Sequence, residues 1–519
     1  MDERVEKSHG LILILDFGSQ YSHLIARRVR DASVFCELVA HDISAEKIKT
    51  LNPKGLILSG GPASVYENDA PHLSPGVLDL DIPVLGICYG LQEITQTLGG
   101  SVVAHEKKEY GYAQLTVSTL GKEALFSDLE DDFSVWMSHG DKIHQLPEGF
   151  VDCGTTSNTE HAAVANIERN IYGLQFHPEV THTKFGTQIL SNFVHEICHC
   201  VGDWSMKNFI EEATEEIRKM VGDELVIGAV SGGVDSTVAA VLMKKAIGDQ
   251  FQAVFVNNGV LRKDEDTEVQ IRMRDKCGVH LTYVDASEEF LAMLAGVTEP
   301  ETKRKIIGNT FIEIFEREAK ASGAKFLLQG TLYPDVIESV SHKGPSATIK
   351  THHNVGGLPE KMNLKLVEPL RLLFKDEVRT LGLILGIEED SIYRHPFPGP
   401  GLSIRILGEI TNERLSVLKE ADSIFIHELR EAGLYRQIGQ AFAVLLPCKA
   451  VGVMGDFRTY EEVIALRAVE TTDYMTAHWF NLPYDLLQRV STRIVNEIRG
   501  VNRVTYDITS KPPGTIEWE

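Results

Sequence analysis

One cysteine in the sequence lies where a nucleophile is expected. Residues 86–90 read GICYG, directly after an apolar run and directly before a helical pattern. In this G-x-nucleophile-x-G pattern the central residue sits on a tight strand-to-helix turn, and the glycines are needed because the backbone passes too close for a Cβ atom. The helix N-terminus behind Cys88 favours a thiolate, which is the nucleophilic form of the side chain.

A histidine and a glutamate further along the chain could serve this cysteine. Residues 176–179 read FHPE and end a predicted strand, which places His177 and Glu179 on the same side of that strand. His177 is then expected to move protons to and from Cys88, and Glu179 is expected to hold the imidazole in the required tautomer.

Two backbone N–H groups are predicted to stabilise the oxyanion of an acyl-transfer reaction at Cys88. One belongs to Tyr89, at the start of the helix, and the other to Gly61, in a glycine loop (residues 59–62, SGGP) that also follows a strand. A lone cysteine is more often a small buried apolar residue than a nucleophile, and a lone His-x-Glu is uninformative. The glycine loop at 59–62, the cysteine turn at 86–90 and the His-x-Glu at 177–179 occur together in one chain. This combination favours the catalytic interpretation.

A second glycine turn has the features of a phosphate-binding loop. Residues 231–236 read SGGVDS and stand between the apolar run LVIGAV and a helical pattern. Glycines allow the backbone to approach phosphate closely, and the helix N-terminus supplies free N–H donors and a favourable dipole. The loop lacks the GK[ST] end of a Walker P-loop, so a different class of nucleotide site is indicated.

These turns require strands and helices that alternate along the chain. Residues 10–16, 55–59 and 82–87 are short apolar runs that predict buried parallel strands, each ending in a glycine-containing turn. Further strands are predicted at 134–137 and 170–176, and a helix at 184–198 closes this unit.

Two more series of elements follow. The first has predicted helices at 206–221 and 236–247 and predicted strands at 225–230, 251–257, 280–284 and 325–329. The last has predicted helices at 412–432 and 483–499 and predicted strands at 440–446, 450–454 and 503–508. The sequence therefore predicts two α/β units followed by a small α+β unit.

The length of 519 residues exceeds what one hydrophobic core supports, so several domains are expected. We predict domains at 1–203, 204–394 and 395–519. The proline- and glycine-rich block HPFPGPG at 395–401 is predicted to be a rigid linker. The polar, glycine-rich and basic segment 341–361 is a candidate mobile lid.

Charge and composition exclude several classes of protein. The formal net charge is −23, whereas a protein whose main partner is nucleic acid usually presents a basic face. No apolar run approaches the ~20 residues that span a bilayer, and the opening residues MDERVEKSHG hold no apolar signal-peptide core. Seven cysteines without a secretion signal indicate reduced thiols, so we expect a cytoplasmic protein that binds neither nucleic acid nor membrane.

A short cluster of histidines and cysteines raises the question of a metal site. It consists of His195, Cys198, His199 and Cys200, and their spacing fits no usual zinc pattern. We expect these residues on a helical surface instead.

The motifs around Cys88 resemble those of class I glutamine amidotransferases over about residues 10–200. In that family a Cys–His–Glu triad forms a glutamyl thioester and releases ammonia, and Cys88, His177 and Glu179 match all three positions. The resemblance implies a class I amidotransferase fold for this domain and glutamine as a substrate.

The SGGVDS loop resembles the pyrophosphate loop of N-type ATP pyrophosphatases, which cleave ATP to AMP and pyrophosphate. The resemblance implies an adenine-nucleotide-alpha-hydrolase-like (PP-loop) α/β fold, with Mg²⁺ on the phosphates of ATP and no tightly bound organic cofactor. Asp235 is the first candidate for positioning the metal or the pyrophosphate. The residues expected to bind ATP are Ser231, Gly232, Gly233, Val234, Asp235, Ser236, Thr237 and, beside the adenine, Val256.

Blocks spread over the whole chain are similar to those of the GMP synthetase family. They read DVIES (335–339), FKDEVR (374–379), HPFPGPGL (395–402), VGVMGD (451–456) and KPPGTIEWE (511–519). In this family ATP adenylylates the O2 of XMP with release of pyrophosphate, and ammonia from glutamine then displaces AMP at C2 to give GMP. The resemblance also implies a homodimer formed through the C-terminal α+β domain.

The same resemblance assigns residues to the acceptor nucleotide. The positions that hold XMP in the family are matched by Arg304, Gln440, Asp456, Lys511 and Glu517. Further phosphate ligands are expected at Lys343, Lys350 and Lys375, for which a solvated surface lysine is the alternative interpretation.

Two other functions fit parts of the sequence. Some proteins with an SGGxDS loop adenylylate tRNA bases, but the charge of −23 and the lack of an aromatic and basic patch argue against an RNA substrate. A non-catalytic dimeric module that retains nucleotide pockets is the other alternative. It is disfavoured because nothing structural requires Cys88, His177 and Asp235 together.

Overall fold

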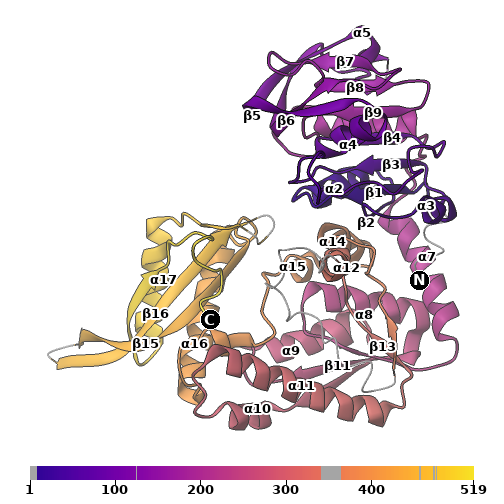
Figure 1. Cartoon of the computed structure of the whole chain (residues 1–519). Coiled ribbons are helices and arrows are strands. Elements are labelled where there is room, and N and C mark those ends of the chain that lie inside the picture. Colours follow the sequence, from indigo (N-terminus) through magenta and orange to yellow (C-terminus); the bar gives the residue numbers. More distant parts are fainter. Residues whose placement is uncertain (1–8, 124, 341–363, 455–456, 472–473, 475) are drawn as a thin grey trace. The chain divides into compact units, whose positions relative to one another are not determined.

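The computed structural model describes residues 9–123, 125–340, 364–454, 457–471, 474 and 476–519 (Figure 1). The chain divides into two compact units, Met1–Glu212 and Ala213–Glu519, and the division falls within helix α7 (Met206–Val221). The candidate lid at 341–361 lies entirely outside the described residues. In the part of the chain that is described, no helix is both long and apolar enough to cross a membrane.

A nine-stranded sheet forms the centre of the first unit, in the order β2-β1-β3-β4-β9-β8-β7-β5-β6. The first five strands in this order are parallel. They are β1 (Ile12–Asp16), β2 (Cys36–Ala40), β3 (Gly55–Leu58), β4 (Val84–Ile87) and β9 (Ile171–Leu174). Every residue of β3, β4 and β9 is buried, which explains why these strands read as continuous apolar runs.

The other four strands continue the sheet in antiparallel pairing. They are β5 (Ser101–Val117), β6 (Asp132–Gln145), β7 (Val151–Thr155) and β8 (Ala163–Asn166). The sequence predicts only residues 134–137 of this part. Strand β6 alternates buried and partly exposed residues over most of its length, so polar side chains interrupt the apolar pattern.

The helices of the first unit flank this sheet (Figure 1). They are α2 (Ser22–Asp31), α3 (Ala45–Leu51), α4 (Tyr89–Thr97), α5 (Thr119–Lys122) and α6 (Gly186–Asn192), which continues as a π-helical turn at Phe193–Ile197. The helix predicted at 184–198 is therefore shorter in the structure, and its last turn is π-helical instead of α-helical. Cys198 and Cys200 beyond it are only 4% and 6% exposed, so the expectation of a helical surface is wrong for them. The described residues contain no group of three or more side chains able to hold a metal ion.

A five-stranded parallel sheet, in the order β12-β11-β10-β13-β14, begins the second unit. Its strands are β10 (Val226–Ala229), β11 (Phe251–Asn257), β12 (Leu281–Asp285), β13 (Phe326–Leu328) and β14 (Lys365–Val367). Its helices are α8 (Val234–Ile247), α9 (Glu265–Gln270) with a π-helical turn at Ile271–Lys276, α10 (Ser287–Leu294), α11 (Pro300–Ser322), α12 (Tyr333–Val340), α14 (Lys375–Ile384) and α15 (Glu389–Ile392).

A second, smaller sheet completes this unit. It contains β15 (Gln440–Met454), β16 (Phe457–Glu470), β17 (His478–Trp479) and β18 (Val501–Tyr506), and its helices are α16 (Asn412–Glu431) and α17 (Tyr484–Glu497). The strands predicted at 440–446 and 450–454 form one strand, β15, whose register against β16 shifts between Leu446 and Lys449.

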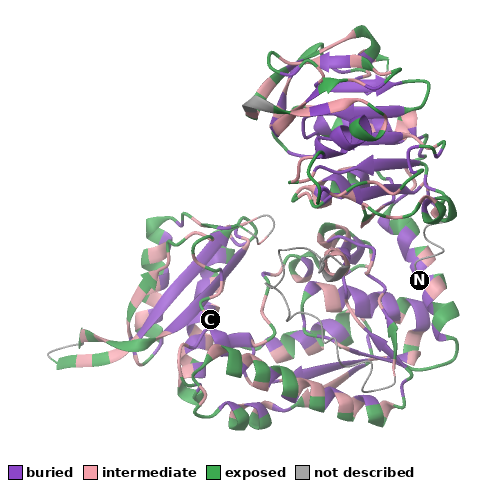
Figure 2. Ribbon diagram, in the orientation of Figure 1, coloured by how far each residue is buried: buried purple, intermediate pink, exposed green. Residues whose placement is uncertain are grey.

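One buried apolar cluster continues from the parallel sheet into the smaller sheet of this unit, and it includes Ile227, Val254, Leu445 and Ile464 (purple in Figure 2). The proline-rich block at 395–401 lies between the two sheets in sequence, and its end is packed tightly. A Cβ on Gly401, whose φ is +62°, would lie 2.4 Å from the carbonyl oxygen of Val260. The N–H of Leu402 donates to the same carbonyl at 2.8 Å. The end of the block therefore packs closely against Val260, while the rigid-linker interpretation of 395–401 and the domain boundary at residue 394 stay predictions.

Candidate active site and nucleotide loop

Cys88 occupies the turn between β4 and α4, with φ +51°. Two glycines make this turn sterically feasible. A Cβ on Gly86 would lie 2.6 Å from the backbone of Gly90 and Leu91, and a Cβ on Gly90 would lie 2.4 Å from the carbonyl oxygen of Leu58. Because real Cβ atoms do not approach backbone this closely, the turn is restricted to glycine at both positions.

Gly90→Ala is expected to destabilise the first unit by about 1–3 kcal/mol, because the new methyl group must displace the backbone of β3. Gly308→Ala is a matched control, since Gly308 also lies in a helix, α11, and a Cβ there meets no atom within 4 Å. Removing that glycine is expected to stabilise the protein by about 0.4–1 kcal/mol. Urea titrations of both variants measure the difference, and equal stabilities would contradict the steric role of Gly90.

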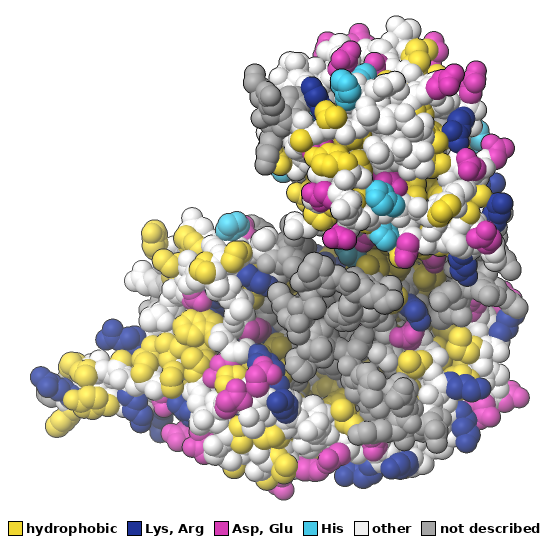
Figure 3. Space-filling model, viewed as in Figure 1, with side chains coloured by type: hydrophobic (Ala, Val, Ile, Leu, Met, Phe, Trp, Pro, Cys, Tyr) yellow, Lys and Arg dark blue, Asp and Glu magenta, His cyan; other side chains and the backbone are white. Residues whose placement is uncertain are grey.

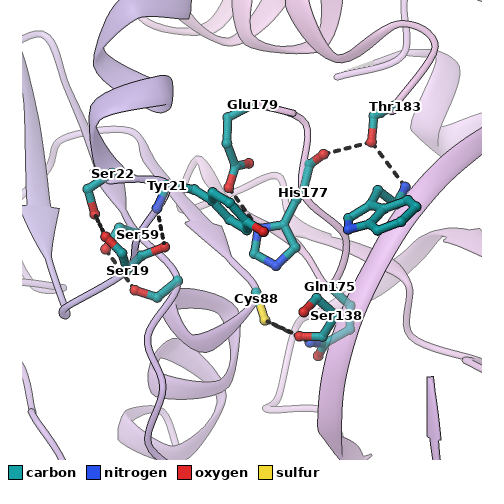
Figure 4. A network of polar contacts seen from close by, with 12 residues as sticks. Ser19, Tyr21, Ser22, Ser59, Cys88, Ser138, Gln175, His177, Glu179 and Thr183 are labelled. Carbon is teal, nitrogen blue, oxygen red and sulfur yellow. Dashed lines mark hydrogen bonds and ion pairs between the residues drawn. The ribbon is translucent and has the colours of Figure 1, made fainter. Parts of the chain in front are cut away.

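His177 and Glu179 are brought together beside Cys88 (Figure 4). His177 Nδ1 and Glu179 Oε1 are 2.7 Å apart, and both side chains are buried. The backbone of His177 is fixed on both sides, since its N–H donates to the Trp136 carbonyl and its carbonyl accepts from Thr183 Oγ1. The predicted positions of all three triad members therefore converge, with the imidazole between the sulfur and the carboxylate.

The electrostatics of this group favour a charged imidazole. Burial by itself lowers the pKa of His177, but the Glu179 carboxylate and the Cys88 side chain outweigh burial, so that the pKa lies well above its usual value. An imidazolium next to a cysteine stabilises the thiolate, which is the form that attacks a carbonyl carbon.

The second glycine loop lies against the start of α4. A Cβ on Gly61 would lie 2.8 Å from the Phe17 carbonyl and 3.3 Å from the ring of Tyr89. A Cβ on Gly60 would lie 3.4 Å from the ring of His177. The loop therefore borders the proposed site, and the oxyanion roles of Gly61 and Tyr89 stay predictions.

Two contacts of the sulfur were not predicted from the sequence. Gln175 Nε2 donates to Cys88 Sγ at 3.7 Å, and the Ser138 carbonyl accepts from the thiol at 3.8 Å (Figure 4). Gln175 is 1% exposed and is itself contacted by Gln92 Nε2 at 3.4 Å. The contact of Gln175 could have been predicted from the sequence. Gln175 precedes His177 by two residues, so the two side chains lie on the same face of the strand end.

The SGGVDS loop joins β10 to α8 and is held by its own side chains. Gly232 has a φ of +75°, and Gly233 is the N-cap of α8. The N–H of Ser231 donates to Ser236 Oγ at 3.2 Å, and Thr237 Oγ1 donates to the Gly233 carbonyl at 2.8 Å. The strand–turn–helix context that a phosphate loop requires is therefore present.

Asp235 and Lys375, predicted separately as metal and phosphate ligands, form an ion pair with each other. The second carboxylate oxygen of Asp235 is buried and has no hydrogen-bond partner among the described residues. A free carboxylate oxygen next to a phosphate loop fits Mg²⁺, which prefers oxygen ligands and usually retains water and substrate phosphates in its shell. Val256 lies in β11, the neighbour of β10, and is 5% exposed.

Of the residues assigned to XMP, the structure brings Gln440 and Glu517 together, with Gln440 Nε2 2.7 Å from Glu517 Oε1. Arg304 forms its ion pair with Glu301 of its own helix, and Lys511 Nζ donates to the Tyr474 carbonyl at 2.7 Å. Asp456, Lys343 and Lys350 lie outside the described residues.

Two buried cations beside these residues were missed. Arg405 has a fully buried side chain and donates twice to Glu517, at 2.8 and 3.1 Å. Lys303, the neighbour of Arg304, is equally buried and lies 2.7 Å from Glu519 Oε2. Both cations anchor carboxylates of the segment 517–519, and no local pattern in the sequence distinguishes them from exposed basic residues.

Arg405→Met is expected to lower the free energy of unfolding by about 1.5–3 kcal/mol, because the Glu517 carboxylate, which is 20% exposed, would lose two charge-assisted hydrogen bonds. Arg489→Met is the control, since Arg489 is half exposed and its pairs with Glu428 and Asp485 are worth about 0–1 kcal/mol. Thermal unfolding of both variants tests this difference. A similar small loss in both would show that the Arg405–Glu517 pair does not stabilise the unit.

Three parts of the chain match known protein families. Residues 13–197 match the family described as glutamine amidotransferase class-I, residues 205–311 match NAD synthase, and residues 427–518 match the GMP synthase C terminal domain. These matches confirm the predicted amidotransferase fold, the PP-loop α/β fold and the third, α+β part.

Full-length relatives give the same result. A GMP synthase [glutamine-hydrolyzing] of Aquifex aeolicus is 59% identical over 98% of this chain and 99% of its own length. The proteins of the same name from Saccharomyces cerevisiae and Phaeosphaeria nodorum are 57% and 58% identical, over 100% and 99% of this chain and over 99% and 98% of their own lengths. Similarity at this level from end to end shows that the chain belongs to the family of glutamine-hydrolysing GMP synthases.

Proposed function

We propose that this chain makes GMP from XMP, with glutamine as the nitrogen donor and ATP as the activating nucleotide. The observation that supports this most directly is the presence, in one chain of this family, of a Cys88–His177–Glu179 cluster and of a separate SGGVDS loop. The first supplies ammonia, and the second activates the acceptor that ammonia attacks.

Glutamine hydrolysis is assigned to the first site. Cys88 Sγ attacks the carboxamide carbon of glutamine, and the oxyanion accepts hydrogen bonds from backbone N–H groups at Tyr89 and Gly61. His177 protonates the departing ammonia and then takes a proton from the water that cleaves the thioester, which releases glutamate. Glu179 holds the ring through the 2.7 Å contact to Nδ1 and stabilises its positive charge.

Acceptor activation is assigned to the SGGVDS loop. The O2 of XMP displaces pyrophosphate from the α-phosphorus of ATP, and ammonia then replaces AMP at C2. The loop N–H groups hold the pyrophosphate, while Asp235 and Lys375 lie where they can bind a metal and a phosphate oxygen. Mg²⁺ bound there would neutralise charge that develops on the leaving group. Gln440 and Glu517 are assigned to XMP, with Arg405 as the residue that positions Glu517.

The assignments of partner and location extend this proposal. A homodimer through the C-terminal domain is supported by exposed apolar side chains on β15 and β16, of which Val453 is 75% and Phe457 79% exposed.

A cytoplasmic location accords with free thiols at all seven cysteines. On the face drawn in Figure 3, acidic and basic side chains of the described residues are interspersed rather than gathered into a basic stripe, which disfavours RNA as a substrate.

The test is a turnover experiment with purified protein, XMP, ATP, Mg²⁺ and glutamine in the absence of RNA. We expect GMP, AMP, pyrophosphate and glutamate in equal amounts. Release of ADP and phosphate instead would overturn the assignment of the loop, and a requirement for RNA would favour the tRNA-modifying alternative.

A further inference from the structure

The second unit contains a cavity of about 560 Å³ that the proposed reaction does not use. It is lined by α9 and the π-helical turn after it, by the segment around α15, and by α16. Six of its lining side chains are basic and four are acidic (Glu268, Glu388, Asp390 and Asp422), in a chain whose net charge is −23. A local excess of positive charge in an acidic protein indicates an anionic ligand.

Some of these basic groups already have carboxylate partners. Lys263 pairs with Glu420, Lys276 with Glu388, and Arg394 with Glu265. Arg430 lies at the exposed rim, with its guanidinium over the ring of Tyr435, and forms no ion pair within the described residues.

Two arginines of the cavity have buried donors without acceptors. Arg272 is 7% exposed and gives one N–H to the Gly232 carbonyl at 3.1 Å, but its Nε has no hydrogen-bond partner in the described structure. The same holds for Nε and Nη2 of Arg262, because Asp422 Oδ2, at 3.5 Å from Nε, lacks hydrogen-bonding geometry. Buried donors are almost always paired in folded proteins, so three unpaired ones in one cavity point to a missing acceptor.

The charge on Arg272 is only partly offset within the chain. Burial, and after it the positive charge of Arg394, lowers the pKa of the Arg272 guanidinium, whereas the carboxylates of Glu265 and Glu268 act in the opposite direction. An anion in the cavity would act in the same direction as these carboxylates.

We propose that this cavity binds the phosphate group of a small molecule, which Arg262, Arg272 and Arg430 hold. A phosphate dianion carries enough oxygens to accept from several guanidinium groups at once, and the planar donor fork of arginine matches its geometry. The cavity lies within the range of about 300–1,000 Å³ that holds small organic ligands, so the phosphate can carry an organic group.

This site is distinct from the proposed ATP loop but touches it. The Gly232 carbonyl accepts from Arg272 and, at 3.4 Å, from Arg394, whereas the N–H groups at the start of α8 are the donors assigned to ATP. A ligand that fixes Arg272 is therefore expected to hold the Gly232 carbonyl, and the loop with it, in the conformation described.

The test is equilibrium dialysis of the full chain against radiolabelled inorganic phosphate at constant ionic strength. Arg430→Gln removes a cavity cation that is exposed and does not contact the loop. Arg317→Gln is the matched control, because Arg317 is an exposed arginine that pairs with Glu318, and neither residue lines the cavity. We expect Arg430→Gln to raise the phosphate Kd by roughly tenfold, as for the loss of one charge-assisted hydrogen bond, and Arg317→Gln to leave it within about twofold.

Phosphate bound at the ATP loop would be the same in all three proteins, so the comparison holds even if the proposed reaction is wrong. Absence of phosphate binding to the unmodified protein, equal binding by all three, or an equal loss in both variants would overturn the cavity site. Competition with AMP separates two sources of the ligand. For the share of binding that Arg430→Gln removes, displacement by AMP at a lower concentration than by unlabelled phosphate identifies a phosphate ester, and weaker displacement identifies free phosphate.

Discussion

Cys88→Ala is expected to abolish glutamine-dependent GMP synthesis while synthesis from ammonium salts continues at a rate close to that of the unmodified protein. The sulfur is the atom that forms the thioester, and neither His177 nor a water molecule at the turn can replace it. Removing a nucleophile of this kind lowers kcat by about 10⁴-fold or more. The SGGVDS loop belongs to a different unit of the chain and needs only ammonia, so the second half-reaction is expected to remain.

Cys153→Ala is the matched control for this variant. Cys153 is also buried, at 2% exposure, and burial raises the pKa of its thiol to about 11, so it stays protonated near neutral pH. We expect full activity with both nitrogen sources after this change, together with a small loss of stability. Assays of GMP formation with glutamine and with ammonium chloride decide the matter. If Cys88→Ala lost both activities with its fold intact, the separation into two sites would be wrong.

Asp235→Ala is expected to remove GMP synthesis from both nitrogen sources. The substitution deletes the buried carboxylate oxygen that is free to bind a metal, and it leaves Lys375 without its ion-pair partner. Both changes weaken the stabilisation of charge on the leaving pyrophosphate, for which losses of about 10²–10³-fold in kcat are typical of a single electrostatic group. Pyrophosphate release in the presence of XMP and ATP, without any nitrogen donor, measures this step directly.

Asp249→Ala provides the comparison within the same region. Asp249 follows the far end of α8, is fully exposed, and pairs only with Lys244 among the described residues. Its removal subtracts the same charge and is expected to leave pyrophosphate release unchanged. Retained release in Asp235→Ala would refute the role given to that residue while leaving the cysteine site untouched.

The features predicted well from sequence are those whose determinants are contiguous. The turn at Cys88, the SGGVDS loop and strands such as β4 and β11 each follow from a short run of residues, because glycine geometry and burial on both faces are local constraints. Helix α11 shows the limit of pattern reading. Pro300 and the capping side chain of Glu299 mark its start, yet the apolar positions along it are too weakly periodic to predict it.

The features that escaped prediction depend on partners far apart in sequence. Arg405 is 112 residues from Glu517, and Lys303 is 216 residues from Glu519. Nothing around an arginine or a lysine in a sequence tells whether a distant carboxylate will permit its burial, since such burial depends on the whole fold. The same reasoning applies to Arg272, whose contact with Gly232 exists only after α9 has packed behind the loop.

The burial of Arg405 also bears on the order in which the protein acquires structure during translation. Its counter-charge is synthesised long after the arginine itself, and until then a low-dielectric environment around the guanidinium is unfavourable. The nine strands of the first unit, in contrast, are all complete by residue 174. The first unit is therefore expected to fold during translation, before the second unit. The second unit can complete its fold only after the residues around Glu517 have emerged from the ribosome.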